Sequence, residues 1–165
     1  MGDDVGNRIV VRPPSFPEVN AGEVLSADPG REWQVLCGDC GHWRLGIYSP
    51  PFSSRQELTR LERHSCPELF LLLSGEIVLV VAEMSSGGPE LREIPLALGK
   101  PVLITQPHAG YCPCGRHTGT AVVVERDEFE THYLPLSGWP SVLAGSRPAA
   151  NGSAAKNCET GDKTD

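Results

Sequence analysis

The sequence predicts an all-β protein built as an antiparallel β-barrel or sandwich. Three observations lead to this fold class. The 165 residues include 18 glycines and 15 prolines, which suits short strands joined by turns better than a helical bundle. Short runs rich in β-branched and aromatic residues recur along the chain, each bounded by Gly, Pro or Ser. Finally, no stretch of ten or more residues carries an uninterrupted apolar period of 3.6 residues.

The candidate strands follow one another through the body of the chain. Turn chemistry separates several of them, for example at Ser74-Gly75 and in the Ser-Ser-Gly-Gly-Pro run at 85–89. One segment, 53–64, can also be drawn as a helix, and the strand assignment is preferred there. The predicted strands are 31–37, 42–48, 56–62, 67–73, 76–82, 90–94, 101–105, 120–126 and 129–133.

The chain is predicted to form one domain with two irregular ends. Residues 31–144 form the barrel. Residues 1–30 mix Pro, Gly and acidic residues and are expected to form an arm over it. Residues 145–165 are poor in apolar residues and are expected to be a disordered tail.

The net charge and the hydropathy of the sequence argue against several classes of binding partner. The net charge is −7 and no Lys/Arg-rich run is present, which argues against nucleic acid and anionic membranes as partners. The acidic start lacks the apolar stretch of a signal peptide, and no apolar run is long enough to span a bilayer. We therefore expect a soluble cytoplasmic protein that acts on a small molecule. Exposed strand edges predict that the protein forms a homodimer.

Charged and imidazole side chains gather on one face of two predicted strands. Arg60, Glu62 and His64 alternate along an extended chain, and Glu68 opens the strand that follows a turn. In the segment 102–108, the same rule brings Val102, Ile104, Gln106 and His108 to one face. Such side chains are costly inside a barrel unless something pairs with them, so they are candidate site residues.

Each of these residues also has an ordinary structural explanation. His64 can be a strand-end histidine, Glu68 a surface acid beside a proline, and His108 a turn residue. Arg60 and Glu62 can form an exposed ion pair, which contributes little stability.

The spacing of these residues resembles the first motif of the cupin superfamily, which are small antiparallel barrels with a jelly-roll core. His64, three residues, Glu68, six residues and Gly75 match that motif throughout. The position two residues before the histidine usually holds a second histidine, and here it is Glu62. Gly99 and Pro107-His108 resemble a shortened second motif. The resemblance covers about residues 43–133 and implies a double-stranded β-helix.

Within the cupins, the sequence resembles the ureidoglycolate lyase family. The matching segments are Leu61-Glu62-Arg63-His64, the apolar run 69–73 and Gln106-Pro107-His108. That family often has Gln in place of Glu68, and the Trp that usually precedes its later His is missing here. The resemblance implies a carbon–nitrogen lyase with catalytic His64, Glu68 and His108, and with Arg60 and Glu62 binding substrate.

The same resemblance allows two other functions. Two imidazoles and a carboxylate can bind Zn²⁺, Fe²⁺ or Mn²⁺, so His64, Glu68 and His108 are also candidate metal ligands. Residues 119–126 resemble a late strand of 3-hydroxyanthranilate dioxygenase, but the position of that family's second metal-binding His falls on Tyr111. A non-catalytic ligand-binding or regulatory cupin without a metal is the remaining alternative.

Cysteines form a second constellation. Cys37 and Cys40 have the C-x₂-C spacing of zinc knuckles, and Cys112 and Cys114 form a tighter pair. Together they are candidates for a structural zinc ion. The alternative, which the Gly and Pro neighbours favour, is that they are ordinary loop thiols.

Overall fold

A computed structural model describes residues 22–138 and shows a fold made of strands. The only helical elements in this range are two short 3₁₀ turns, and no helix in it has the length and apolar character needed to span a membrane. The elements in chain order are β1 (Trp33–Asp39), β2 (Trp43–Tyr48), η1 (Arg55–Glu57), β3 (Arg60–His64), β4 (Glu68–Ser74), β5 (Val78–Ser85), β6 (Gly88–Pro95), β7 (Val102–Ile104), β8 (His108–Tyr111), β9 (Thr120–Glu125), β10 (Thr131–Pro135) and η2 (Leu136–Gly138).

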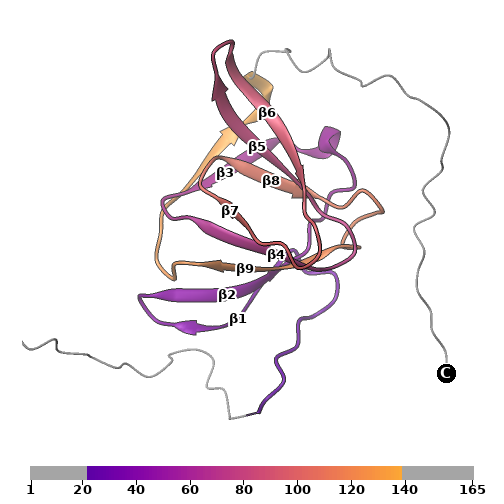
Figure 1. Cartoon of the computed structure of the whole chain (residues 1–165), viewed down its shortest axis with the longest axis vertical. Coiled ribbons are helices and arrows are strands. Elements are labelled where there is room, and N and C mark those ends of the chain that lie inside the picture. Colours follow the sequence, from indigo (N-terminus) through magenta and orange to yellow (C-terminus); the bar gives the residue numbers. More distant parts are fainter. Residues whose placement is uncertain (1–21, 139–165) are drawn as a thin grey trace, which may run out of the picture.

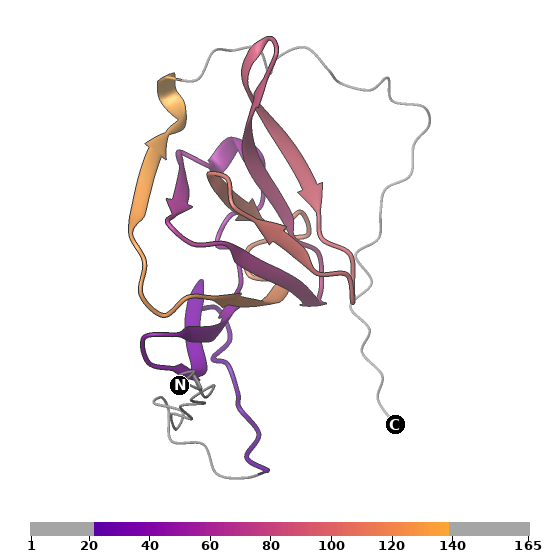
Figure 2. The same ribbon diagram turned by 60° about the vertical axis from the view of Figure 1, so that its left-hand side comes forward.

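The strands form two five-stranded sheets in which every pairing is antiparallel. Sheet A has the order β1-β2-β9-β4-β7 and sheet B has the order β10-β3-β8-β5-β6. Figure 1 shows sheet A in the lower half of the body and sheet B above it, and the turned view in Figure 2 shows the β5–β6 hairpin extending beyond the body. The predicted all-β, jelly-roll barrel is thus confirmed.

Two strand predictions differ from the structure. The predicted strand at 56–62 is instead the turn η1 followed by β3, because the Glu57 carboxylate accepts hydrogen bonds from Ser53 and closes a local turn. The helix considered for 53–64 does not form. β8 was not predicted, because its Ala109 and Gly110 lack the β-branched side chains that mark strands in a sequence. The predicted 145–165 tail and most of the 1–30 arm lie outside the described residues.

The apolar core has two parts, one between the sheets and one on the outer side of sheet B. The first packs residues such as Phe70, Leu79 and Val123 between the two sheets. The second packs Leu61 and Val80 beneath the chain segment around η1 and beneath η2. β5 therefore has buried side chains on both of its faces over most of its length.

The structure explains why the last position of the first motif, residue 75, is a glycine. Gly75 has φ +65°, a conformation that favours glycine, and a Cβ there would lie 2.0 Å from the carbonyl oxygen of Thr118. It lets the chain turn between β4 and β5 directly against the segment that leads into β9.

Candidate functional site

The candidate site is a cavity of about 330 Å³ between the inner faces of the two sheets. Its lining combines aromatic rings with an unusual number of charged side chains. The charged and imidazole lining residues are Glu32, Arg44, Arg60, Glu62, His64, Glu68, His108 and Glu125.

Three strands bring the predicted site residues together. On β3 the side chains of Glu62 and His64 face the cavity, while Leu61, the residue before Glu62, is fully buried in the outer core. Glu68 is the first residue of β4 and His108 the first of β8. Glu62 and His108 are directly paired across β3 and β8. The structure therefore brings four of the predicted site residues, Glu62, His64, Glu68 and His108, into one cluster.

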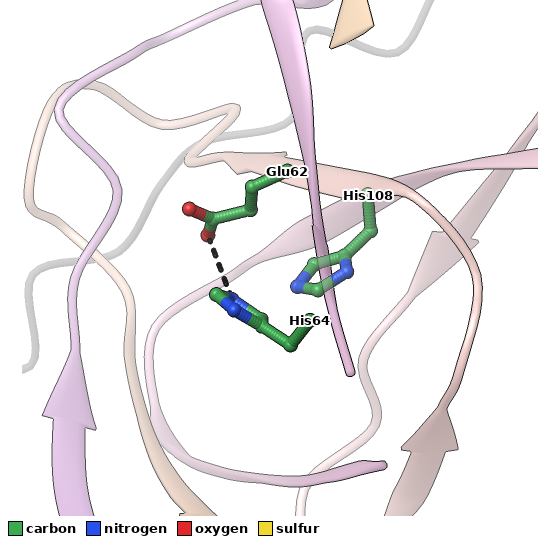
Figure 3. Close-up of side chains that lie close together, drawn as sticks. All are labelled: Glu62, His64 and His108. Carbon is green, nitrogen blue, oxygen red and sulfur yellow. Dashed lines mark ion pairs between the residues drawn. The ribbon is translucent and has the colours of Figure 1, made fainter. Parts of the chain in front are cut away.

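The cluster is held at contact distance. Oε1 of Glu68 lies 3.4 Å from Nε2 of His64 and 3.5 Å from Nε2 of His108. Oε1 of Glu62 lies 3.9 Å from the same Nε2 of His64. Figure 3 shows Glu62, His64 and His108 pointing toward one another. The carboxylate of Glu68 is therefore situated between the two imidazoles.

The far nitrogen of each imidazole has its own partner. Nδ1 of His108 donates to the carbonyl oxygen of Gln106 at 3.0 Å, because a carbonyl can only accept. Nδ1 of His64 shares a 2.8 Å hydrogen bond with Oγ1 of Thr131. These bonds orient the rings and direct both Nε2 atoms into the cavity, as expected for metal-binding histidines.

The carboxylates control the protonation of the imidazoles. Burial acts to lower the pKa of His108, but the hydrogen bond to Glu68, the negative charges of Glu68 and Glu62 and the bond to the Gln106 carbonyl together raise the pKa above 6.5. For His64, burial again acts downward, and the Glu62 and Glu68 carboxylates raise the pKa overall. Burial would raise the pKa of Glu62, but the imidazoles lower it below 4.5. Without a cation in the cavity, the protonated imidazoles are thus favoured.

An ion pair that was not predicted from the sequence lies beside this cluster. Nε of Arg44 on β2 donates to Oε1 of Glu125 on β9 at 2.8 Å, and the charged Nη2 lies 2.8 Å from the same oxygen. The guanidinium also packs 4.8 Å from the ring centre of Phe129, whose ring contacts His64 edge-on with 4.6 Å between the ring centres. A sequence signal existed, because Glu125 has the inward alternation of the buried residues Ala121 and Val123 on β9.

Arg60 also lines the cavity, but it lies at the exposed side of the cluster. Its guanidinium lies 4.2 Å above the ring of Tyr133, and no ion pair to a described carboxylate within 4.0 Å is found for it. Its charge is therefore available to a ligand at this end of the cavity.

The donor set suits a divalent metal ion. The described residues contain two groups of three potential metal ligands. Within each group the ligand atoms lie within 4.8 Å of one another, and both groups include His64. One group is Glu62, His64 and His108, and the other is His64, Glu68 and Glu125. Because four carboxylates and two guanidiniums line the cavity, neutral imidazoles leave an excess of two negative charges. Imidazole and carboxylate donors are those that Zn²⁺, Fe²⁺ and Mn²⁺ accept.

The four cysteines considered for zinc are distributed differently. Cys37 is half-buried on β1, Cys40 is exposed in the turn after it, and Cys112 is fully buried in the core between the sheets. Cys114 lies half-buried in the turn that follows β8. Among the described residues, no group of potential metal ligands contains any of them. The structural zinc site stays a prediction.

Tyr111 does not occupy the cavity. It packs in the outer core with Leu58, and its phenol is hydrogen-bonded to Glu93. His108, three residues earlier, supplies the imidazole inside.

Comparison with solved structures finds cupin-domain proteins. A cupin 2 domain-containing protein from Halorhodospira halophila matches 64% of this chain and 70% of its own, with 13% identity and a TM-score of 0.47. Cobalt(II) HppE in complex with Tris buffer matches 69% of this chain and 62% of its own, with 17% identity and a TM-score of 0.45. Hazelnut (Corylus avellana) vicilin matches 66% of this chain and a third of its own (33%), with 14% identity and a TM-score of 0.46.

Sequence comparison finds no relative. No protein-family profile matches the chain, and no curated protein sequence matches it. The three structures differ widely in nature, from metal-containing HppE to a vicilin, and at these identities they indicate no substrate for this chain.

Proposed function

We propose that this chain is a divalent-metal-dependent enzyme for a small hydroxy acid, with its active site in the barrel cavity. The observation that carries the proposal is the position of Glu68 between the Nε2 atoms of His64 and His108, at 3.4 and 3.5 Å, in a cavity lined by four carboxylates. His64, His108 and Glu62 would hold the ion. Bound there, the ion would act as a Lewis acid toward a substrate oxygen.

The proposed reaction is that of a ureidoglycolate lyase, in line with the sequence resemblance. Ureidoglycolate carries a hydroxyl and a urea nitrogen on one carbon, next to a carboxylate. Arg60 would bind the carboxylate through charge-assisted hydrogen bonds. Glu68 would accept the hydroxyl proton as the carbonyl forms and the carbon–nitrogen bond breaks, and would then pass that proton to the departing nitrogen. Urea and glyoxylate result, and no other reactant is needed.

The test is release of urea and glyoxylate by metal-stripped protein reloaded with Zn²⁺, Mn²⁺ or Fe²⁺. We expect Glu68→Gln, His64→Ala and His108→Ala each to lower turnover at least about 100-fold, the scale of lost acid–base catalysis. The two histidine variants should also lose bound metal. His132→Ala is the matched control, because His132 is an exposed histidine outside the cavity and pairs with Glu130.

Two results would count against the proposal. No release by wild type with any of the three ions would refute the lyase reaction. Release that persists in all three cavity variants would refute the catalytic roles assigned to Glu68, His64 and His108. Binding of ureidoglycolate or glyoxylate without turnover would instead support a ligand-binding protein.

A second candidate function is a metal-dependent dioxygenase. The specific observation in its favour is that His108 supplies a second imidazole to the cavity, which gives the two-histidine, one-carboxylate set typical of non-haem Fe²⁺ oxygenases. Consumption of O₂ by the Fe²⁺-loaded protein in the presence of small aromatic acids would distinguish it from a lyase, which needs no oxygen.

A further inference from the structure

Arg44 is fixed in place beside the proposed metal ligands. Its guanidinium lies between the rings of Trp33 and Phe129, with 5.6 and 4.8 Å to their centres, and makes two 2.8 Å contacts to one oxygen of Glu125. The Glu125 side chain is only 3% exposed. An arginine that packs against two aromatic rings and is paired with a buried carboxylate has little freedom to move.

Glu125 is more than the partner of Arg44. It forms the second donor group with His64 and Glu68, within 4.8 Å. His64 belongs to both groups, so the two cation positions adjoin. Its Nδ1 is bonded to Thr131, and the remaining Nε2 can serve only one ion, so a second ion would be held by the carboxylates of Glu68 and Glu125. Two-metal sites are built in this way, from neighbouring donor groups.

The second position holds two buried carboxylates, those of Glu68 and Glu125. Burial raises the pKa of Glu125, Arg44 lowers it, and the negative charge of Glu68 raises it further. An uncompensated pair of buried carboxylates is strongly unfavourable, so a counter-charge is required at this point. In this structure the guanidinium of Arg44 supplies it.

We propose that Arg44 is a built-in counter-cation that occupies the second of two adjoining cation positions, so that the cavity binds one divalent ion rather than two. This inference rests on the proposed function for the first ion only. A guanidinium suits the task because it stays protonated at every physiological pH and no competing metal can displace a covalently attached charge.

The test counts metal ions per folded chain by native mass spectrometry after reloading with Zn²⁺ and removal of free metal. We expect one ion in wild type and two in Arg44→Met, which opens the second position. Arg44→Lys keeps the charge and should bind one ion. Arg92→Met is the matched control, since it removes an exposed ion pair with Glu83 outside the cavity, and its count should equal that of wild type.

A double variant covers the case in which Arg44→Met folds poorly without metal. Arg44→Met/Glu125→Gln removes both charges, so it should fold without metal and bind one ion. Addition of Zn²⁺ should raise the melting temperature of Arg44→Met by more than that of the double variant. The reason is that only the single variant keeps the Glu125 carboxylate without its arginine partner.

The outcomes separate this inference from the proposed function. Wild type that binds no ion would refute the metal-dependent function. The counter-cation role is tested by comparing the number of bound ions among the variants. It is supported if Arg44→Met binds one more ion than wild type and the double variant does not. An equal count in Arg44→Met and wild type, two ions in wild type, or a gain that survives Glu125→Gln would overturn it.

Discussion

Glu68 and His108 meet across the interior of the barrel, with 3.5 Å between Oε1 and Nε2, although their strands belong to different sheets. Each is the first residue of its strand, and His64 is the last residue of β3. The site therefore depends on how the strand ends of the two sheets are placed against each other. This relationship ties the chemistry of the cavity to the stability of the fold.

The raised pKa values of the two imidazoles predict how stability changes with pH in the metal-stripped protein. A group whose pKa is higher in the folded state than in the unfolded state stabilises the fold below its unfolded pKa of 6.5, and this contribution disappears as the pH rises through the folded pKa. We expect the melting temperature of metal-stripped protein to fall between about pH 6 and about pH 8. Scanning calorimetry at several pH values measures it.

The controls for this pH dependence come from the same chain. His108→Gln should flatten the profile, whereas exposed His132→Gln should leave it unchanged. Glu62, with its lowered pKa, acts in a separate window, because its contribution disappears only as the pH falls through its folded pKa below 4.5. A melting temperature that rises from about pH 6 to about pH 8 would contradict the assignment.

The sequence was sufficient to predict the part of the site that depends on strand alternation. Glu62 and His64 face one way because they are two residues apart on an extended strand, and this holds in β3. The same rule failed at Gln106, which was grouped with Ile104 and His108 but is exposed. The reason is that the chain leaves sheet A after β7 and enters sheet B at β8, so alternation does not continue between them.

Contacts that depend on three-dimensional pairing could not be predicted in this way. Arg44 meets Glu125 because β2 and β9, far apart in sequence, are neighbours in exact register at those two residues. Thr131 reaches His64 through the corresponding pairing of β10 with β3. No local pattern in a single sequence specifies which of ten short strands lie side by side.

Two glycines provide a matched test of close packing in the turns. Gly75 and Gly99 have similar backbone angles, φ +65° and +73°, but only Gly75 lies against another segment, at Thr118. We expect Gly99→Ala to lower the free energy of unfolding by about 1 kcal/mol, and Gly75→Ala by roughly 3 kcal/mol or more, because the strain is joined by a steric clash. Urea denaturation measures both, and equal losses would contradict the packing argument.

Cys112 is expected to stabilise the core independently of any metal. Its Sγ accepts a hydrogen bond from the buried backbone N–H of Gly119 at 3.3 Å. Cys112→Ala leaves that donor without a partner and should cost about 1–3 kcal/mol, whereas Cys37→Ala on the half-buried face of β1 should cost less. Thermal melts measure the difference.

The same two variants test the structural zinc ion predicted from the cysteine spacing. If zinc is bound by the cysteines, both Cys37→Ala and Cys112→Ala should release about one zinc ion per chain, as measured by elemental analysis. Retention of zinc by both variants would refute a zinc ion bound by the cysteines. So would a wild-type protein that contains no zinc and melts at the same temperature as a chelator-treated sample.

Arg60 and Tyr133 are expected to set the affinity of the cavity for carboxylates. The guanidinium lies 4.2 Å from the ring centre of Tyr133 and is directed to the exposed side of the cavity. We expect Arg60→Met to weaken glyoxylate binding about 10- to 100-fold, the value of charge-assisted hydrogen bonds, as measured by calorimetry. Tyr133→Leu removes the ring that positions Arg60 and should weaken binding about two- to fivefold. Tyr133→Phe keeps the ring and should bind as wild type does.

Unchanged binding in Arg60→Met would show that the carboxylate is held elsewhere. A loss of affinity in Tyr133→Phe equal to that in Tyr133→Leu would assign the effect to the hydroxyl of Tyr133 rather than to its ring.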